Sequence, residues 1–204
     1  MNILDQASFS YQDVEITSRE SLFRGFIQVE KVSLCHRQFH DSAYTPVIQR
    51  ELIHRPEAAG VLIYDDQQQK FALIEQFRVG ALDDPHSPWQ LEVIAGVLDG
   101  DESPESCIQR ESLEEAGCEI SNLQHLFSFY PSAGACSEFF HLYAAKANLP
   151  AEGGIFGMVD EGEDIKLHLF DYKDIVSLLN HGRLRNAPVI MALQWLQQTI
   201  NKTS

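Results

Sequence analysis

The sequence predicts a mixed α/β fold preceded by a small N-terminal antiparallel β segment. Three observations support this fold class: strand-like runs recur through residue 146, a capped helical stretch lies among them after residue 103, and two helical patterns follow towards the C-terminus. The 204 residues suffice for one large domain, or for a compact domain with a smaller appendage. We expect residues 1–54 to form the β segment and residues 55–204 to form the main domain.

The strands are predicted from short stretches that are apolar or that alternate apolar and polar residues. Residues 12–39 have this alternation in pieces. The polar segment DDQQQ between two apolar runs indicates a hairpin. Further strands are expected at residues 47–55, 57–64, 70–79, 89–96, 123–130 and 138–146, and in IKLHLFDY at 165–172.

Three helices are predicted. The first has Ser103 as its N-cap, Pro104 at its first position and Gly117 just past its end. The others are expected near residues 171–181 and 187–201, and the last carries an apolar stripe of Val189, Leu193, Leu196 and Ile200. Between the strands expected at 138–146 and 165–172, residues 150–164 are rich in glycine and acids without periodicity, which predicts a long, mobile loop.

The composition argues against several classes of function. The chain has 30 Asp and Glu against 15 Lys and Arg, a formal net charge of −15, which disfavours binding to nucleic acid or to an anionic membrane. The four cysteines show no CxxC spacing, so neither a zinc nor a redox motif is expected. No run approaches the ~18 apolar residues of a membrane span, and the N-terminal residues lack the pattern of a signal peptide. We therefore expect a cytoplasmic protein.

The stretch GVLDGDESPESCIQRESLEEAGC, residues 96–118, has seven acids and one base. On a helix Glu111, Glu114 and Glu115 share one face, while Ile108, Leu113, Ser112 and Ala116 form an arc that suits docking on a sheet. Neighbouring carboxylates repel one another, and a hard divalent cation such as Mg²⁺ would relieve the repulsion. The alternative is a solvated acidic face with no ligand.

The spacing of this stretch decides between these readings. It fits G-x5-E-x7-R-E-U-x-E-E-x-G-U through Gly96, Glu102, Arg110, Glu111, Glu114, Glu115 and Gly117. This pattern resembles the Nudix box, which marks hydrolases of nucleoside diphosphates linked to another group. Ser112 departs from the pattern, which usually has an aliphatic residue there, and we expect its hydroxyl to bond to the carbonyl one turn back.

Motifs outside the box resemble those of the bacterial ADP-ribose pyrophosphatases. They are RESLFRGF, QREL at 49–52, EQFR at 75–78, PWQLEVIAG before the box, SAGACSE at 132–138, DEGEDI at 160–165 and NAPVIMALQWL at 186–196. The resemblance implies a Nudix α/β/α sandwich with a mixed sheet, in a homodimer that exchanges its N-terminal β segments. It implies hydrolysis of ADP-ribose to AMP and ribose 5-phosphate with two or three Mg²⁺ ions, for which Mn²⁺ can substitute.

Two other functions stay open on the same residues. One is a Nudix hydrolase for another nucleoside diphosphate sugar, such as GDP-mannose. The other is a non-catalytic module that binds ADP-ribose; such modules typically lose acids of the box, and every one of those acids is present here.

The resemblance also implies roles for single residues. Glu111, Glu115, Glu163 and the carbonyl of Ala95 are implied as metal ligands, and Glu161 is implied as the general base. Glu92 and Glu102 are expected to hold Arg110 and the box loop, with Glu114 within reach of Arg110. The candidate substrate contacts are Phe26, Arg50, Glu51, Arg78, Ser132 and Glu138, against the alternatives of plain packing and surface ion pairs. The loop that holds Ser132 and Glu138 has Ala133 where the family usually has proline.

Overall fold

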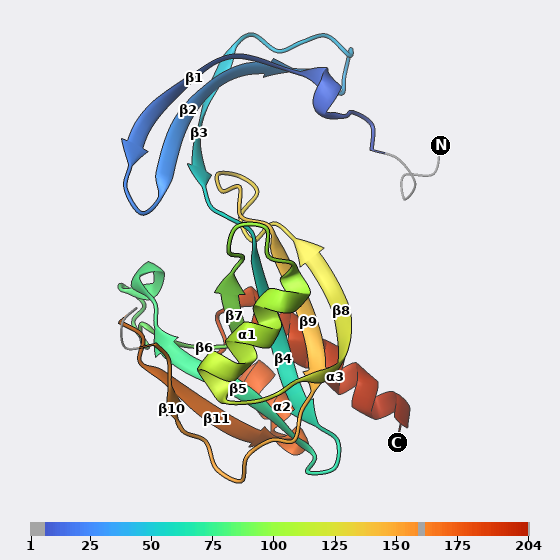
Figure 1. The fold of residues 1–204 in the computed structure, drawn as a ribbon. Helices are drawn as coiled ribbons and strands as arrows, with labels where there is room; N and C mark the ends of the chain where they lie inside the picture. Colours follow the sequence, from blue (N-terminus) through green and yellow to red (C-terminus); the bar gives the residue numbers. More distant parts are fainter. Residues whose placement is uncertain (1–6, 159–161, 204) are drawn as a thin grey trace. The chain divides into compact units, whose positions relative to one another are not determined.

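The computed structural model describes residues 7–158 and 162–203, which form two compact units (Figure 1). The first unit ends at Pro56 and also takes in Ser132–Glu138, and the second comprises Glu57–Pro131 and the residues from Phe139 onward. The loop at Ser132–Glu138 joins the first unit through the backbone. The Ile53 amide donates to the carbonyl of Ala135 over 2.8 Å, and the Ser137 amide donates to the carbonyl of Ile53 over 3.0 Å.

The first unit is a three-stranded antiparallel sheet in the order β1 (Val14–Arg24), β2 (Gln28–His36) and β3 (Ile48–His54). Every residue of β1 is exposed, and Val32 is the one hydrophobic side chain of this unit, in its described part, that is fully buried. Several large apolar side chains of the same unit lie open, among them Ile16, Leu22, Phe23 and Phe26. A sheet with so little core of its own leaves much apolar surface uncovered.

The second unit is built on a mixed sheet in the order β10-β11-β5-β4-β9-β8. Strands β4 and β9 are parallel, and the other described pairs are antiparallel, including β6 on β5 and β7 on β4. The strands are β4 (Ala58–Asp65), β5 (Lys70–Phe77), β6 (Trp89–Glu92), β7 (Ile94–Val97), β8 (Ser121–Phe129), β9 (Phe140–Lys146), β10 (Ile155–Phe156) and β11 (Ile165–Asp171).

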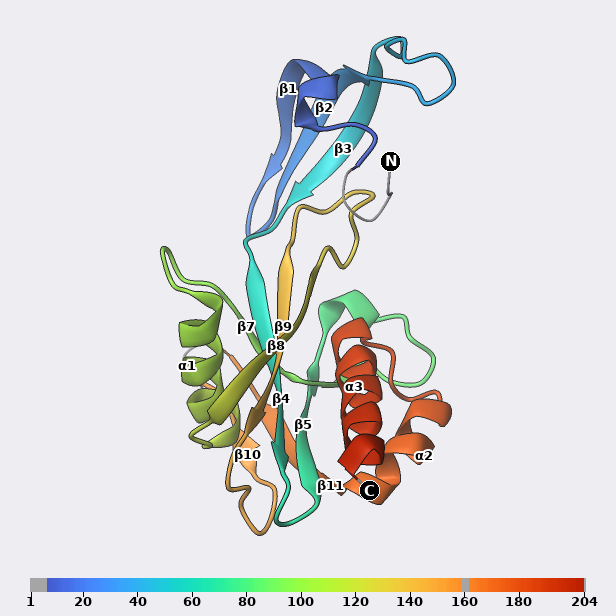
Figure 2. The ribbon, with the colours of Figure 1, turned by 90° about the vertical axis from the view of Figure 1, so that its right-hand side faces the viewer.

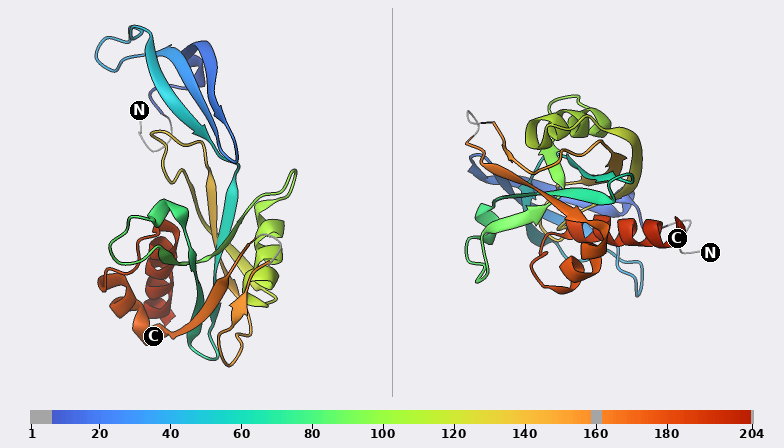
Figure 3. Two further views of the ribbon diagram at one scale, coloured as in Figure 1. Left: turned by 90° about the vertical axis from the view of Figure 1, so that its left-hand side faces the viewer. Right: turned by 90° about the horizontal axis from the view of Figure 1, so that it is seen from below.

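Helices cover both faces of this sheet (Figure 2). Because side chains alternate along β4, Val61 and Ile63 point to the face covered by α1 (Pro104–Ala116), and Leu62 and Tyr64 point to the opposite face. That opposite face is covered by α2 (Ile175–Asn180) and α3 (Ala187–Thr203), as Figure 3 also shows from two further sides. The predicted α/β/α sandwich with a mixed sheet is confirmed.

Helix α3 packs through the side of its predicted stripe that lies nearest the sheet. Val189, Leu193 and Leu196 are fully buried, whereas Ile200 is only partly buried at the edge of the same cluster. No helix in the described parts of the chain is long and apolar enough to cross a membrane.

The structure differs from the expected elements at three places. The strand expected over 89–96 breaks at Val93, which lets β6 pair with β5 while β7 pairs with β4. The loop expected over 150–164 contains the short strand β10, paired with β11. The side chain of Leu113, expected to dock on the sheet, is 53% exposed because α1 turns Ile108, Ser112 and Ala116 inward instead.

Candidate functional site

Helix α1 begins and ends where its caps predict. The Ser103 hydroxyl accepts a hydrogen bond from the Ser106 amide over 3.2 Å, and Gly117 has a left-handed backbone with φ of 60°. In the middle of the helix the buried Ser112 hydroxyl donates to the carbonyl of Ile108 over 2.5 Å, one turn back. The departure from the box pattern is therefore accommodated within the helix itself.

Glu115 is the most buried acid of the helix, with 2% of its surface exposed. Its Oε2 accepts a hydrogen bond from the Ala95 amide over 3.1 Å, so the carboxylate lies against strand β7. Burial raises the pKa of Glu115 to about 8, and the charges of Glu111 and Glu163 push it in the same direction. A bound cation would stabilise the charged form of such a buried carboxyl group and so lower its pKa.

Glu111 lies against Gly96, which is part of strand β7. A methyl group at Gly96 would overlap the Glu111 carboxylate, so only glycine permits this approach. Burial raises the pKa of Glu111 above its usual range, while Arg110, whose Nη1 is 2.7 Å from Glu111 Oε1, acts in the opposite direction. The opening glycine of the box thus provides space for a side chain of α1.

Arg110 ties the helix to the loop before it. Its guanidinium donates to Glu102 over 3.2 and 3.0 Å and to Glu114 over 3.1 Å, in addition to Glu111. The hydrogen bond from Arg110 holds the pKa of Glu102 below its usual range. Glu102 and Glu114 therefore lie around Arg110 and fix its position by charge-assisted hydrogen bonds.

Glu92 has a different partner from the one expected. Instead of Arg110 it binds Arg78, whose Nε and Nη2 lie 3.0 and 2.8 Å from Glu92 Oε2. Glu92 ends β6 and is paired with Ile74 of β5, and Arg78 directly follows β5, so the contact joins two neighbouring strands. Sequence reasoning assigned no role to Asn186, which donates to Glu92 Oε1 over 2.9 Å, although the motif NAPVIMALQWL that begins with Asn186 marked the position.

Glu163 is held by its own loop. Its amide donates to the carbonyl of Met158 over 3.2 Å, and its Oε2 accepts from the Met158 amide over 3.0 Å. Gly157, which precedes Met158, has a φ of 103°, and a Cβ at Gly157 would lie only 2.8 Å from the Cβ of Glu163. The charge of Glu163 adds to the effect of burial in raising the pKa of both Glu111 and Glu115. Glu161, the expected base, lies outside the described residues.

The remaining candidates for substrate contact belong to the first unit. Phe26, in the turn between β1 and β2, is 99% exposed. Arg50 and Glu51 are exposed on β3, and the Arg50 guanidinium donates to the neighbouring Gln49 carbonyl. In the loop that joins this unit, the Ser132 carbonyl accepts from the Cys136 amide, and Glu138 lies 3.7 Å from Arg55. Of the predicted contacts, Arg78 alone belongs to the second unit with Glu111 and Glu115.

The donor set of the second unit suits a hard divalent cation. Two carboxylates of α1 and the backbone at Ala95 converge on one side of β7, and oxygen ligands are those that Mg²⁺ prefers. In the described residues no three His, Cys, Asp or Glu side chains form a ready metal cluster. In this arrangement the Glu111 carboxylate contacts Arg110, and the Glu163 carboxylate contacts the Met158 amide.

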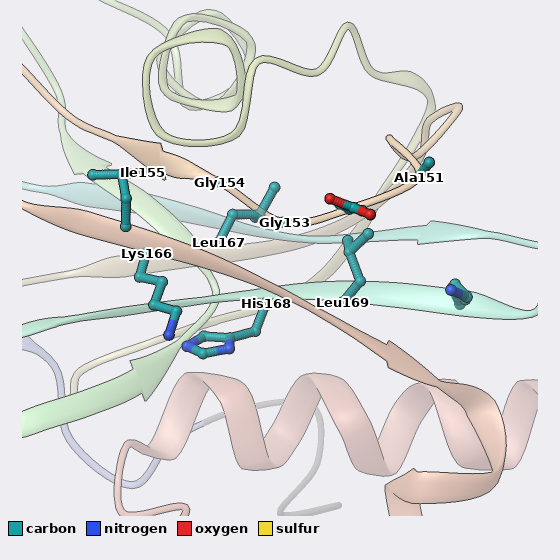
Figure 4. Close-up of a pocket in the computed structure, with 10 residues that line it drawn as sticks. Ala151, Gly153, Gly154, Ile155, Lys166, Leu167, His168 and Leu169 are labelled. Carbon is teal, nitrogen blue, oxygen red and sulfur yellow. The ribbon is translucent and has the colours of Figure 1, made fainter.

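The described part of the second unit contains cavities, and two of them differ in their relation to the site. One, of about 520 Å³, follows β11 between Ile155 and Leu169 and is lined by no residue of the candidate site (Figure 4). The other, of about 530 Å³, is lined by Arg78, Glu92 and Asn186 together with Asp84 and Arg185. Only the second cavity borders the chemistry described above.

Comparison with known proteins gives consistent matches. The family model described as NUDIX domain matches residues 54–193. The chain is 36% identical over 192 residues to the ADP-ribose pyrophosphatase of Haemophilus influenzae, covering 93% of this chain and 88% of that protein. It is 35% identical over 153 residues to the GDP-mannose pyrophosphatase of Yersinia pestis, covering 72% of this chain and 74% of that one.

One solved structure extends the comparison to the fold. The crystal structure of an ADP compounds hydrolase superposes with a TM-score of 0.67 at 24% sequence identity, covering 94% of this chain and 98% of that chain. At this identity the likeness concerns the fold, which spans both units of the present chain.

Proposed function

Because the chain belongs to the Nudix family, we propose that it is a hydrolase that cleaves the pyrophosphate of ADP-ribose into AMP and ribose 5-phosphate. The similarity to an ADP-ribose pyrophosphatase over 93% of the chain supports this substrate. The observation that carries the chemistry is the pair Glu111 and Glu115, which α1 presents beside Gly96 and Ala95.

A divalent cation, which we propose to be Mg²⁺, would be held by Glu111, Glu115, Glu163 and the Ala95 carbonyl. When bound, it supplies neutralisation of the pyrophosphate oxygens and polarisation of the attacking water. The burial of Glu115 and its raised pKa support the assignment, because such a carboxyl group is stabilised when a cation replaces its proton. We propose two or three ions in each site, with Mn²⁺ able to substitute for Mg²⁺.

The protein side chains have separate tasks in this reaction. Arg78 offers guanidinium donors to the phosphate oxygens, and Arg110 keeps Glu111 and the box loop in place. Glu161 accepts the proton of the attacking water as general base. Glu161→Gln is expected to lower kcat by ~10²–10⁴ while cation binding, measured by calorimetry, is retained. An unchanged kcat would remove Glu161 from this role.

The first unit supports a proposal about assembly. Its exposed apolar side chains, and Val32 as the one buried hydrophobic residue among its described residues, fit a homodimer in which the N-terminal segments are exchanged and cover one another. Phe26, Arg50, Glu51, Ser132 and Glu138 would then contact the substrate from this unit. Sedimentation equilibrium tests the dimer, and a monomer at micromolar concentration would contradict it. We further propose a cytoplasmic location.

A substrate panel tests the proposed function directly. Purified protein with Mg²⁺ is assayed on ADP-ribose, GDP-mannose and NADH, with products identified by mass in ¹⁸O water. We expect the highest kcat/KM for ADP-ribose and the label in one of the two phosphate products, which identifies the phosphorus attacked. Equal or higher kcat/KM for GDP-mannose would favour the alternative suggested by the second relative, whose similarity covers less of the chain.

The same assay excludes a role in binding alone. A module that only binds ADP-ribose would not turn it over, and Glu115→Gln would leave any measured rate unchanged. We expect this variant to lose most of the activity of the wild type, since Glu115 is a proposed metal ligand.

A further inference from the structure

The Glu92 carboxylate is buried, with 6% of the residue exposed, and both of its oxygens are bound. Oε2 accepts two hydrogen bonds from Arg78, and Oε1 accepts one from the side-chain amide of Asn186. These two partners come from different places in the chain, since Arg78 follows β5 and Asn186 precedes α3. Glu92 therefore cannot rotate without breaking one of the contacts, and its orientation fixes that of Arg78.

Arg78 uses one edge of its guanidinium for Glu92 and keeps the other edge open. Nε and Nη2 donate to Glu92, whereas Nη1 has no hydrogen-bond partner within residues 7–158 and 162–203. The side chain is 44% exposed, so the open edge can receive an anion. The hydrogen bonds to Glu92 raise the pKa of Arg78, and the charges of Glu115 and Glu163 act in the same direction, so the guanidinium lies within electrostatic range of these proposed metal ligands.

Asn186 contributes a hydrogen-bond donor, its side-chain amide nitrogen, to the contact with Glu92. Its Nδ2 donates to Glu92 Oε1, while its Oδ1 is buried without a partner in the part of the chain that the structure describes. The amide cannot be turned round, because Oδ1 would then face a carboxylate oxygen. Helix α3 holds this residue in place, since Val189 and Leu193, in its first two turns, are fully buried in the core.

The cavity of about 530 Å³ lies beside the contacts among Arg78, Glu92 and Asn186. Arg78 and Glu92 line it together with Asp84, whose carboxylate pairs with Arg185 over 3.0 Å. A guanidinium that is no longer held through Glu92 has room to move there, and Asp84 offers it another carboxylate.

From these contacts we propose that Asn186 is a positioning residue, which holds Glu92 so that Glu92 directs Arg78 to the pyrophosphate of the bound nucleotide sugar. The proposal rests on the proposed function for its substrate. It gives the motif NAPVIMALQWL a role in binding the substrate, through a residue that does not touch it.

Two variants and a matched control test the role. Asn186→Leu removes the donor without adding charge, and Asn186→Asp keeps the shape but replaces the donor by an acceptor. Asn201, exposed on the same helix, receives the same two substitutions as a control. We expect both Asn186 variants to raise KM for the nucleotide sugar about tenfold with a smaller change in kcat, and both Asn201 variants to match the wild type. Kinetics of Asn186→Leu equal to those of Asn201→Leu would overturn the proposal.

A double-mutant cycle with Arg78→Gln separates positioning from general damage to the fold. If Asn186 acts through Arg78, adding Asn186→Leu to Arg78→Gln should raise KM no further. Additive effects of the two substitutions would overturn the proposal. Thermal unfolding of each variant shows whether it is folded.

A second readout does not depend on the substrate. In the wild type, NMR should detect slow exchange of the Arg78 Nε proton with water, because that proton donates to Glu92. We expect Asn186→Leu and Asn186→Asp to accelerate this exchange, and an unchanged rate would overturn the proposal. If the wild type hydrolyses no nucleotide sugar, the proposed function fails, while this exchange rate still decides whether Asn186 holds Arg78 through Glu92.

Discussion

Replacing Glu115 by glutamine is expected to stabilise the metal-free protein at neutral pH. The folded protein keeps the Glu115 proton up to a pKa of about 8, whereas an unfolded chain releases it near 4.5. Between these values the folded state binds more protons than the unfolded state, so the stability of the wild type falls as the pH rises through this window. Glutamine does not titrate, and its side-chain oxygen can still accept from the Ala95 amide.

The size of the effect follows from the difference between the two pKa values. At 1.36 kcal/mol for each pH unit above 4.5, the Glu115 proton costs the wild type about 3 kcal/mol of unfolding free energy at pH 7. Below pH 4.5 the group is protonated in both states and this cost disappears. The stability of Glu115→Gln relative to the wild type should therefore grow from pH 5 to pH 8.

Urea denaturation in the presence of a chelator measures this difference, at one fixed protein concentration and at several pH values. Glu119→Gln, at an exposed glutamate beyond the end of α1, is the matched control and should follow the wild type at every pH. A difference between Glu115→Gln and the wild type that does not change with pH would refute the reasoning. Adding Mg²⁺ should stabilise the wild type more than Glu115→Gln, because the cation binds the ionised carboxylate.

Three further substitutions probe the box. Gly96→Ala places a methyl group in the space of the Glu111 carboxylate, and we expect cation binding, measured by calorimetry, to weaken about 10- to 100-fold in a folded protein. Arg110→Lys loses the fork that bridges Glu102 and Glu111, so kcat/KM should fall by a similar factor; an unchanged value would show that Arg110 serves only as a point charge. Ser112→Ala removes the hydrogen bond to the Ile108 carbonyl and should change the unfolding free energy by less than about 1.5 kcal/mol with kcat intact, whereas a large loss of kcat would mean that the serine shapes the site.

Most of the fold could be predicted from local patterns in the sequence. The caps at Ser103 and Gly117, the alternation in the strands and the apolar stripe of α3 depend on residues close together in the chain, and each produced the expected element. The break at Val93 could not be predicted, because it depends on which neighbouring strand each half of the stretch pairs with. Strand pairing joins residues that are distant in sequence, and local patterns of apolar and polar residues do not show which strands pair.

The sequence by itself determined the family and the identity of the box residues, because the spacing of Gly96, Glu111 and Glu115 is read along one loop and one helix. Only the tertiary structure decided their environment. In the folded chain Glu115 is buried against β7, which raises its pKa. Glu92 forms hydrogen bonds with Arg78, 14 residues away, and with Asn186, 94 residues away. The physical reason is that burial and side-chain pairing depend on how β5, β6, α1 and α3 pack together, whereas helix spacing depends only on the local chain.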